Sequence, residues 1–226
     1  MKTYKSIVVF SGGQDSTTCL GAAIYAHGAE NILAVAFDYG QKHRIELEQA
    51  KKIAALLNVD FQVVDVPALR LMESSGLVTG GDVTSGHEYL KDLPASFVPA
   101  RNALFLTIAF GLAMEAKASL IYTGVCQTDY SGYPDCRAEF IEKLNFALAA
   151  GYQSSIIIVT PLMNLTKAET FALAHEVGVL DVVINDSHTC YNGERDLVHE
   201  WGRGCGTCPA CALRAKGYSE YKAEAA

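Results

Sequence analysis

The 226-residue sequence lacks the features of an exported or membrane-inserted protein. Its longest apolar run, residues 103–114, lies between Arg101 and Glu115. That run is too short to span a bilayer, so we expect a buried helix there. A strand-like run already begins at residue 6, and we expect no signal peptide before it. These absences favour a cytoplasmic protein without a membrane partner.

An excess of basic residues is also missing. The 18 Lys and Arg residues are outnumbered by 25 Asp and Glu residues, which gives a net charge of -7. A surface that neutralises a nucleic-acid backbone needs clustered positive charge, so we expect no nucleic-acid partner. The sequence has no internal repeat, and its length suffices for one sizeable core with at most a small satellite lobe.

Strand-like and helix-like patterns alternate along the chain. The predicted strands are residues 6–10, 32–37, 61–66, 120–123 and 156–160. The predicted helices are residues 16–27, 43–58, 101–117, 138–150 and 166–178. This alternation predicts an α/β fold, a doubly wound parallel sheet with helices on both faces. Ligands of such sheets bind beyond the carboxyl ends of the strands, where the strand order reverses.

Two details refine this prediction. Thr166 is an expected N-cap of the last predicted helix, with Glu169 completing a capping box, and Gly178 is its expected end. Residues 67–98 are rich in Gly, Ser and Pro and show no clear element. A loop of this length in a compact domain is commonly functional, and we expect a mobile lid.

The turn after the first strand carries the strongest chemical signal. It reads Ser11-Gly12-Gly13-Gln14-Asp15-Ser16, followed by Thr17 at the start of the helix. Two glycines allow a tight turn, and the N–H groups of a helix start attract an anion. Asp15 suits this place if Mg²⁺ lies between its carboxylate and a phosphate. An ordinary glycine-rich turn is the alternative.

This loop is neither a Gly-x-Gly-x-x-Gly motif nor a Walker loop. It resembles the pyrophosphate loop of N-type ATP pyrophosphatases, Ser-Gly-Gly-x-Asp-Ser, at every fixed position. The resemblance implies ATP as a co-substrate and a Rossmann-like fold of the adenine nucleotide alpha hydrolase type. The residues it implies for ATP binding are Phe10, Ser11, Gly12, Gly13, Gln14, Asp15, Ser16 and Thr17.

Further segments across nearly the whole chain resemble the 7-cyano-7-deazaguanine synthase family. They are Asp38-Tyr39-Gly40-Gln41-Lys42-His43-Arg44, Phe97-Val98-Pro99-Ala100-Arg101-Asn102, Thr123-Gly124-Val125-Cys126, Asp129-Tyr130-Ser131-Gly132-Tyr133-Pro134-Asp135-Cys136-Arg137, Thr160-Pro161-Leu162, Lys167-Ala168-Glu169 and Cys190-Tyr191-Asn192-Gly193. The resemblance implies conversion of 7-carboxy-7-deazaguanine and ammonia into the nitrile precursor of queuosine, through adenylated acid and amide intermediates. It also implies a homodimer.

The implied chemistry needs charge stabilisation and positioning more than a protein nucleophile. Asp15, Lys167 and Arg101 are the predicted catalytic residues. Lys167 lies at a helix start, where a cation opposes the helix dipole unless an anion is near. A solvated lysine in the first helical turn is the alternative for Lys167, and an ordinary surface ion pair is the alternative for Arg101.

A deazaguanine ring offers N–H donors to a carboxylate and a flat face to an aromatic ring. The segments that match the family supply these groups, and the predicted substrate-binding residues are Phe97, Asp129, Tyr133 and Asp135. Turn-forming aspartates are the alternative for Asp129 and Asp135. Arg44 has two interpretations, a contact with phosphate or substrate and a solvated arginine at a helix start.

Four of the seven cysteines lie near the end of the chain, at Cys190, Cys205, Cys208 and Cys211. Reduced thiols at this spacing predict a metal site, and the resemblance favours one structural Zn²⁺. An iron–sulfur cluster fits the spacing as well. Residues 194–203 lengthen the usual family spacing, which leaves His188 and His199 as competing fourth ligands, but Cys190 is the predicted one. We expect an ATP pyrophosphatase domain over residues 1–186 and a zinc-binding lobe over residues 187–226.

Two other functions fit parts of the sequence. A tRNA-modifying enzyme such as a thiolase shares the phosphate loop, and Cys126 and Cys136 are available as its reactive cysteine. A non-enzymatic nucleotide sensor with a zinc tail is the other. No glutaminase-like segment is present, so ammonia is expected to come free or from another protein.

Overall fold

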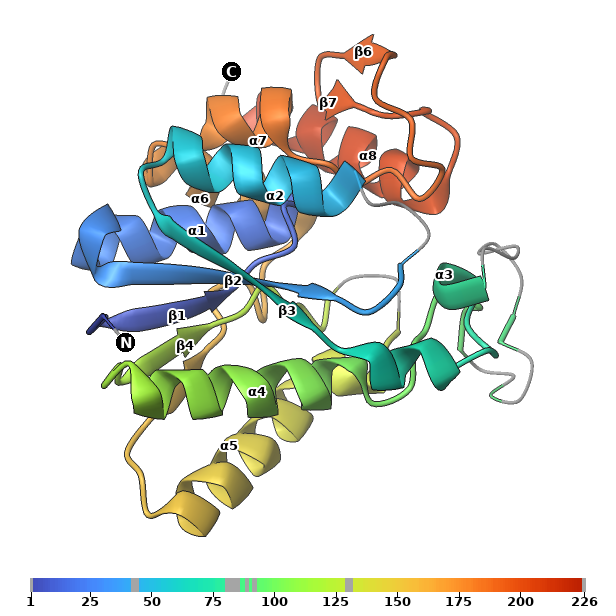
Figure 1. Cartoon of the computed structure of the whole chain (residues 1–226). Helices are drawn as coiled ribbons and strands as arrows, with labels where there is room; N and C mark the ends of the chain where they lie inside the picture. The colour runs from blue at the N-terminus through green and yellow to red at the C-terminus, as the bar shows by residue number, and fades with distance from the viewer. Residues whose placement is uncertain are drawn as a thin grey trace.

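The computed structural model describes residues 2–41, 45–79, 86–87, 90, 93–128 and 132–224. Its centre is a five-stranded parallel sheet with the strand order β3-β2-β1-β4-β5 (Figure 1). The strands are β1 (Ser6–Val9), β2 (Ile32–Asp38), β3 (Asp60–Asp65), β4 (Leu120–Tyr122) and β5 (Ile157–Val159). The order reverses between β1 and β4, so the predicted doubly wound α/β fold is confirmed.

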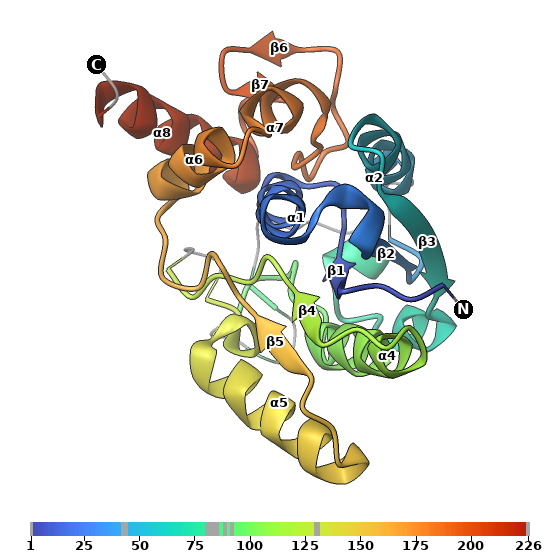
Figure 2. The same cartoon turned by 90° about the vertical axis from the view of Figure 1, so that its left-hand side faces the viewer.

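Helices cover both faces of the sheet, because successive strand residues point to opposite sides. On β1, Val8 belongs to the core under α1 (Gln14–His27) and α2 (Ile45–Leu56). Its neighbour Ile7 belongs to the core under α4 (Arg101–Glu115) and α5 (Ala138–Tyr152). The views in Figures 1 and 2 show these two helical layers above and below the sheet.

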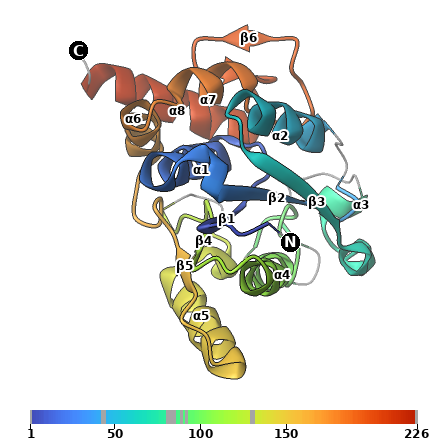
Figure 3. The same cartoon turned by 60° about the vertical axis from the view of Figure 1, so that its left-hand side comes forward.

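Three further helices extend the layer that contains α1. They are α6 (Lys167–Glu176), α7 (Leu180–Asp186) and α8 (Pro209–Glu224), and Figure 3 shows α8 on the opposite side of the sheet from α5. Phe171 of α6 is fully buried and packs 5.2 Å from the ring of Tyr218 and 6.1 Å from the ring of Tyr221. The chain after residue 186 therefore shares a core with α6.

The predicted capping box of α6 is present. The Glu169 N–H donates to Thr166 Oγ1 at 3.2 Å, and the Thr166 N–H donates to Glu169 Oε2 at 2.7 Å. The prediction that this helix is the last one is wrong, because α7 and α8 follow it. The helix itself ends at Glu176 with Val177 as its C-cap, and Gly178 follows with φ +76°, as expected of a glycine that terminates a helix.

Short elements occupy the remaining connections. Residues 67–98 contain the 3₁₀ helix η2 (Pro67–Leu71), the short α3 (Gly76–Thr79) and a bridge between Gly86 and Pro94. The other short elements are η1 (Ala29–Asn31), η3 (Pro134–Cys136), β6 (Val198–His199) and β7 (Gly202–Arg203). Among the described residues, no helix combines the length and apolar character that crossing a membrane requires.

Candidate functional site

A cavity of about 330 Å³ opens beyond the carboxyl ends of β1, β2 and β4. Its walls come from the loop after β1, the ends of β2 and β4, the starts of α2, α4 and α6, and the cysteine-containing tail. This is the strand-order reversal at which the sequence pattern predicts a ligand. Nine predicted site residues line it: Phe10, Ser11, Gly13, Gln14, Asp15, Ser16, Arg101, Tyr133 and Lys167.

The loop between β1 and α1 is held in one conformation by its own side chains and by α2. Gly12 has φ +78°, and a Cβ there would lie 2.8 Å from the backbone nitrogen of Ala50. The hydroxyl of Ser16 accepts the Ser11 N–H at 3.2 Å and lies 3.2 Å from the Gly13 carbonyl oxygen. The start of α1, with its N–H groups lacking intrahelical acceptors, therefore borders the cavity.

Lys167 and Asp15 form an ion pair beside this loop. Lys167 Nζ lies 2.8 Å from Asp15 Oδ1 and 2.7 Å from Asp15 Oδ2. The Lys167 side chain is only 10% exposed, so it is not a solvated lysine. The Cα of Gly217 in α8 faces Lys167, and a Cβ there would contact the Lys167 backbone. The lysine thus occupies space that α8 leaves open.

The tail reaches the loop through two hydrogen bonds, and a third within the tail supports them. The His188 N–H donates to the Gly12 carbonyl oxygen at 2.9 Å. The hydroxyl of Thr189 accepts the Gln14 N–H at 3.4 Å and an Arg214 guanidinium N–H at 3.1 Å. Arg214 is fully buried, and burial lowers its pKa to about 10, which leaves it charged at neutral pH. Its other nitrogens donate to the carbonyl oxygens of Trp201 and Val183 at 2.9 and 2.6 Å.

The opposite wall of the cavity is aromatic and carries a carboxylate and a guanidinium. The rings of Phe37 and Phe105 stack at 4.2 Å, and Tyr39 lies 5.7 Å from Phe105. Arg101 is partly buried with its guanidinium over the Tyr133 ring, so it is not an ordinary surface ion pair. Glu46 faces the same cavity. Burial raises the pKa of Glu46 to about 7, against the opposing effect of Arg101.

The predicted substrate residues do not all reach the cavity. Tyr133 lines it, with its ring 6.0 Å from the Arg101 guanidinium. Phe97 and Asp135 are buried behind this wall, where Phe97 packs 5.6 Å from Tyr133 and Asp135 accepts the Asn102 N–H at 3.4 Å. Burial raises the pKa of Asp135. Asp129 and Arg44 lie outside the described residues.

Gly12 and Thr17 are likewise not part of the cavity lining. Thr17 belongs to α1 and is fully buried. Glu46 lines the cavity but is not among the residues predicted from the sequence. A glutamate in the first turn of a helix is common, because it interacts favourably with the helix dipole. The sequence therefore did not indicate that Glu46 lines a cavity.

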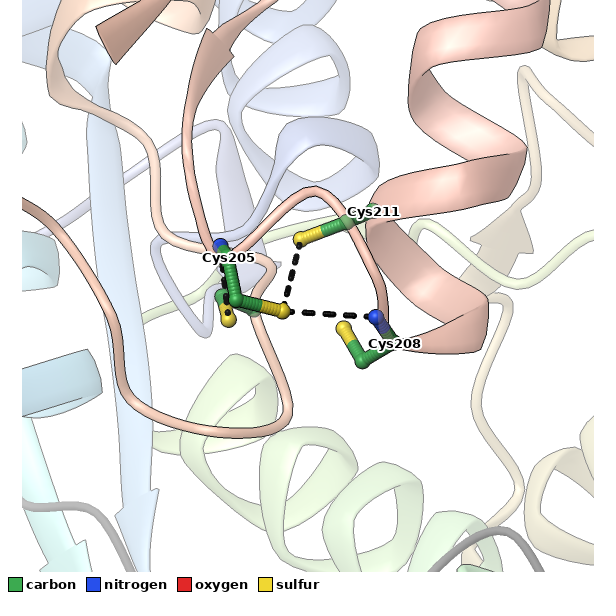
Figure 4. A group of neighbouring side chains, drawn as sticks. Cys205, Cys208 and Cys211 are labelled. Atoms are coloured by element: carbon green, nitrogen blue, oxygen red, sulfur yellow. Dashed lines mark hydrogen bonds between the residues drawn. The ribbon is translucent and has the colours of Figure 1, made fainter. Parts of the chain in front are cut away.

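The structure brings the four predicted cysteines together. The sulfur atoms of Cys190, Cys205, Cys208 and Cys211 all lie within 4.8 Å of one another. Figure 4 shows the thiols of Cys208 and Cys211 turned toward that of Cys205, and the Cys205 and Cys211 sulfurs are 3.9 Å apart. The N–H groups of Thr207 and Cys208 point at the Cys205 sulfur, at 3.4 and 3.3 Å. This cluster could hold a metal ion.

The two histidines that compete for the fourth ligand position lie elsewhere. His199 stacks on Trp201 with ring centroids 4.4 Å apart and hydrogen bonds to the Gly204 carbonyl oxygen at 3.0 Å. His188 lines the cavity. The extra residues 194–203 contain the hairpin β6–β7, which protrudes from the tail (Figure 2). Cys190 remains beside Cys205, whose N–H points at the Cys190 sulfur at 3.4 Å.

Comparisons with known proteins agree over almost the whole chain. The family model described as "Queuosine biosynthesis protein QueC" matches residues 5–222. A 7-cyano-7-deazaguanine synthase of Wolinella succinogenes is 51% identical over 220 residues, which cover 96% of this chain and 94% of that protein. The synthase of Helicobacter pylori strain P12 is 47% identical, with 97% and 96% covered. That of Parvibaculum lavamentivorans is 43% identical, with 97% and 96% covered.

Similar solved structures are more distant. An NH3-dependent NAD synthetase from Campylobacter jejuni gives a TM-score of 0.46 at 15% identity, covering 80% of this chain and 69% of that one. A predicted subunit of tRNA methyltransferase from Methanocaldococcus jannaschii gives a TM-score of 0.48 at 20% identity, covering 77% of this chain and 74% of that one. Both TM-scores are below 0.5.

Proposed function

The chain belongs to the QueC family of queuosine biosynthesis proteins, and from this premise we propose that it is a 7-cyano-7-deazaguanine synthase. The reaction turns a carboxylate and ammonia into a nitrile and consumes ATP twice. The carboxylate attacks the α-phosphorus and pyrophosphate leaves. Ammonia then displaces AMP to give the amide. A second ATP adenylates the amide oxygen, and loss of AMP with a proton leaves the nitrile.

One observation carries this proposal. A single cavity joins a phosphate loop, with Lys167 and Asp15 beside it, to a wall of aromatic and charged side chains. The N–H groups at the start of α1 suit the β- and γ-phosphates of ATP. The aromatic wall suits a flat ring. Both reactants thus have suitable partners in the same cavity, as an in-line transfer requires.

Each proposed catalytic residue has a task that its position supports. Lys167 stabilises the charge of the departing pyrophosphate, and its low exposure strengthens that interaction. Asp15 offers the carboxylate that would hold Mg²⁺, and the ion would supply positive charge beside the phosphates. Arg101, fixed beside Tyr39 and Tyr133, orients the carboxylate of the substrate toward the α-phosphorus.

The cysteine cluster fits one Zn²⁺ ion. Tetrahedral zinc with Zn–S bonds of about 2.3 Å places its sulfurs roughly 3.8 Å apart, close to the 3.9 Å between Cys205 and Cys211. Each thiolate of a four-iron cluster binds a different iron, which needs a wider arrangement than sulfurs within 4.8 Å. Four thiolates leave no open coordination position, so the proposed zinc is structural.

The remaining expectations concern the surroundings of the enzyme. Ammonia reaches the cavity free or from another protein, the chain works in the cytoplasm, and two copies form a homodimer. These follow from the family resemblance. Family membership also favours the synthase over a tRNA-modifying enzyme or a nucleotide sensor.

Reconstitution tests the proposed function. The purified chain is incubated with 7-carboxy-7-deazaguanine, ATP, Mg²⁺ and ammonium, and we expect nitrile together with AMP and pyrophosphate. Asp15→Asn is expected to lower turnover by about 100-fold or more while its thermal melt stays normal. Release of ADP in place of AMP would contradict the adenylation route, and the absence of nitrile with a folded protein would contradict the function itself.

A further inference from the structure

A carboxylate in the cavity has no role in the phosphate chemistry. Among the described residues that line the cavity, the carboxylates are Asp15 and Glu46. Asp15 is bound at both oxygens by Lys167 and lies beside the phosphate loop. Glu46 lies in the first turn of α2, next to the aromatic wall beyond the end of β2. The two carboxylates therefore serve different parts of the cavity.

The surroundings of Glu46 suit a flat, polar ring. Arg101 attracts it, and the hydroxyl of Tyr39 interacts with both of these charged groups. The apolar surface beside them is supplied by Phe37, Phe105 and other side chains of the lining, Leu47 and Leu77. A ring placed here would lie on apolar side chains with its edge toward an acceptor and a donor.

The guanine edge matches this pair of groups. It presents two adjacent donors, the N1–H and the 2-amino group, and an acceptor at O6. The two oxygens of one carboxylate accept both donors, and a guanidinium donates to O6. The adenine edge presents a single donor beside the N1 acceptor, which would face a carboxylate with repulsion. A Glu–Arg pair thus selects a guanine-type ring over an adenine.

We propose that Glu46 binds the N1–H and 2-amino groups of the deazaguanine ring, and that Arg101, which carries five N–H donors, donates to its O6 as well as to the carboxylate on the same side of the ring. This inference rests on the proposed synthase function, and it assigns the two nucleobases to separate ends of the cavity. Glu46 is the residue that distinguishes the substrate ring from that of ATP. Burial raises the pKa of Glu46 to about 7, and hydrogen bonds from the ring donors would favour its charged form.

The test separates binding of the ring from catalysis. The probe is 7-deazaguanine, which lacks the carboxyl group and cannot react, and its binding is measured by calorimetry alongside that of 7-deazaadenine. Wild type is expected to prefer 7-deazaguanine. Glu46→Gln is expected to weaken its binding roughly tenfold or more and to reduce the preference. Binding of a non-hydrolysable ATP analogue is expected to be unchanged.

The matched control is Glu48→Gln, an equal change at an exposed position of the same helix, which should bind both ligands as wild type does. Thermal melts check that each variant is folded. Unchanged binding of 7-deazaguanine by Glu46→Gln would overturn the inference and leave the synthase function standing, and so would a loss of the ATP analogue alone. A wild-type chain that neither binds 7-deazaguanine nor converts the carboxylated compound would overturn both.

Discussion

Single glycines fix the distance between the phosphate loop and its neighbours. Gly124, just after β4, faces the loop so closely that a Cβ would lie 3.0 Å from both the Asp15 carbonyl carbon and the Ser16 nitrogen. Both of these are backbone atoms, which cannot rotate away as a flexible side chain does. The position of the loop therefore depends on the missing side chain at residue 124.

Gly124→Ala is expected to displace Asp15 and the start of α1 while the fold persists. A displacement approaching 1 Å in a catalytic group costs on the order of 100-fold in rate, so we expect kcat/KM for ATP to fall by about 10- to 100-fold. Steady-state kinetics at saturating ammonia provide the measurement. Wild-type kinetics in this variant would show that the loop position tolerates the methyl group.

A second glycine supplies the control. Gly111 lies in the interior of α4 and is exposed, and a Cβ added there would have no neighbouring atom within 4 Å. Gly111→Ala should leave the kinetics unchanged and stabilise the chain by roughly 0.5–1 kcal/mol, because alanine has the better helix propensity.

Among single residues, those of the phosphate loop are the ones whose role is predicted from the sequence. The turn itself requires the glycines and the Asp-Ser pair of residues 11–16. Their place in the structure can therefore be predicted from the local sequence pattern. Phe97 and Asp135 have the right chemistry for a ligand but lie behind Tyr133. Glu46 is the opposite case, a cavity residue that the sequence did not predict. Its place in the cavity depends on how α2 packs on β2, which no local sequence pattern specifies.

Among the elements, the connection between the cysteine tail and the phosphate loop has the clearest functional consequence. Thr189 accepts a hydrogen bond from the loop at Gln14 and another from Arg214 of α8. Its hydroxyl thus links α8 to the start of α1. The neighbouring His188 N–H holds Gly12 directly.

Thr189→Val is expected to leave both donors without their acceptor and to loosen the loop. A lost acceptor for a buried donor costs about 1 kcal/mol or more, which corresponds to a KM for ATP raised roughly fivefold. Thr189→Ser retains the hydroxyl and should behave as wild type. Equal KM values for the valine and serine variants would mean that the hydroxyl does not position the loop.

The elements predicted correctly from the sequence are those with regular apolar spacing, such as the strands and α4. Helix α8 was not predicted from the sequence, because its buried positions are Cys211, Arg214, Gly217 and Tyr221. The spacing is helical, but a buried arginine and a glycine do not form an apolar stripe. The burial of Arg214 is explained by the carbonyl groups that accept its hydrogen bonds. The glycine at residue 217 is explained by the close approach of the Lys167 backbone.

In the whole molecule, the cysteine cluster and the cavity are parts of one structure. Tyr191, next to Cys190, and Ala210, next to Cys211, both line the cavity, as do Leu213 and Arg214. The proposed zinc therefore stabilises a wall of the site as well as the tail. Loss of the metal should affect nucleotide binding in addition to stability.

Removal of zinc by a strong chelator is expected to lower the thermal midpoint by several degrees and to weaken binding of an ATP analogue. Metal analysis before and after treatment, a thermal melt and calorimetry provide the measurements, and added Zn²⁺ should restore both properties. An unchanged melt after complete metal loss would contradict a structural metal, whereas a lower melt with unchanged nucleotide affinity would contradict the coupling to the cavity.

The order in which the walls of the cavity occur along the chain has a consequence for biosynthesis. The loop after β1 is made well before its supports at residues 188–189 and 214. A nascent chain that has completed the sheet still lacks the C-terminal support of its phosphate loop. We therefore expect a nascent chain to bind ATP weakly until α8 has been made.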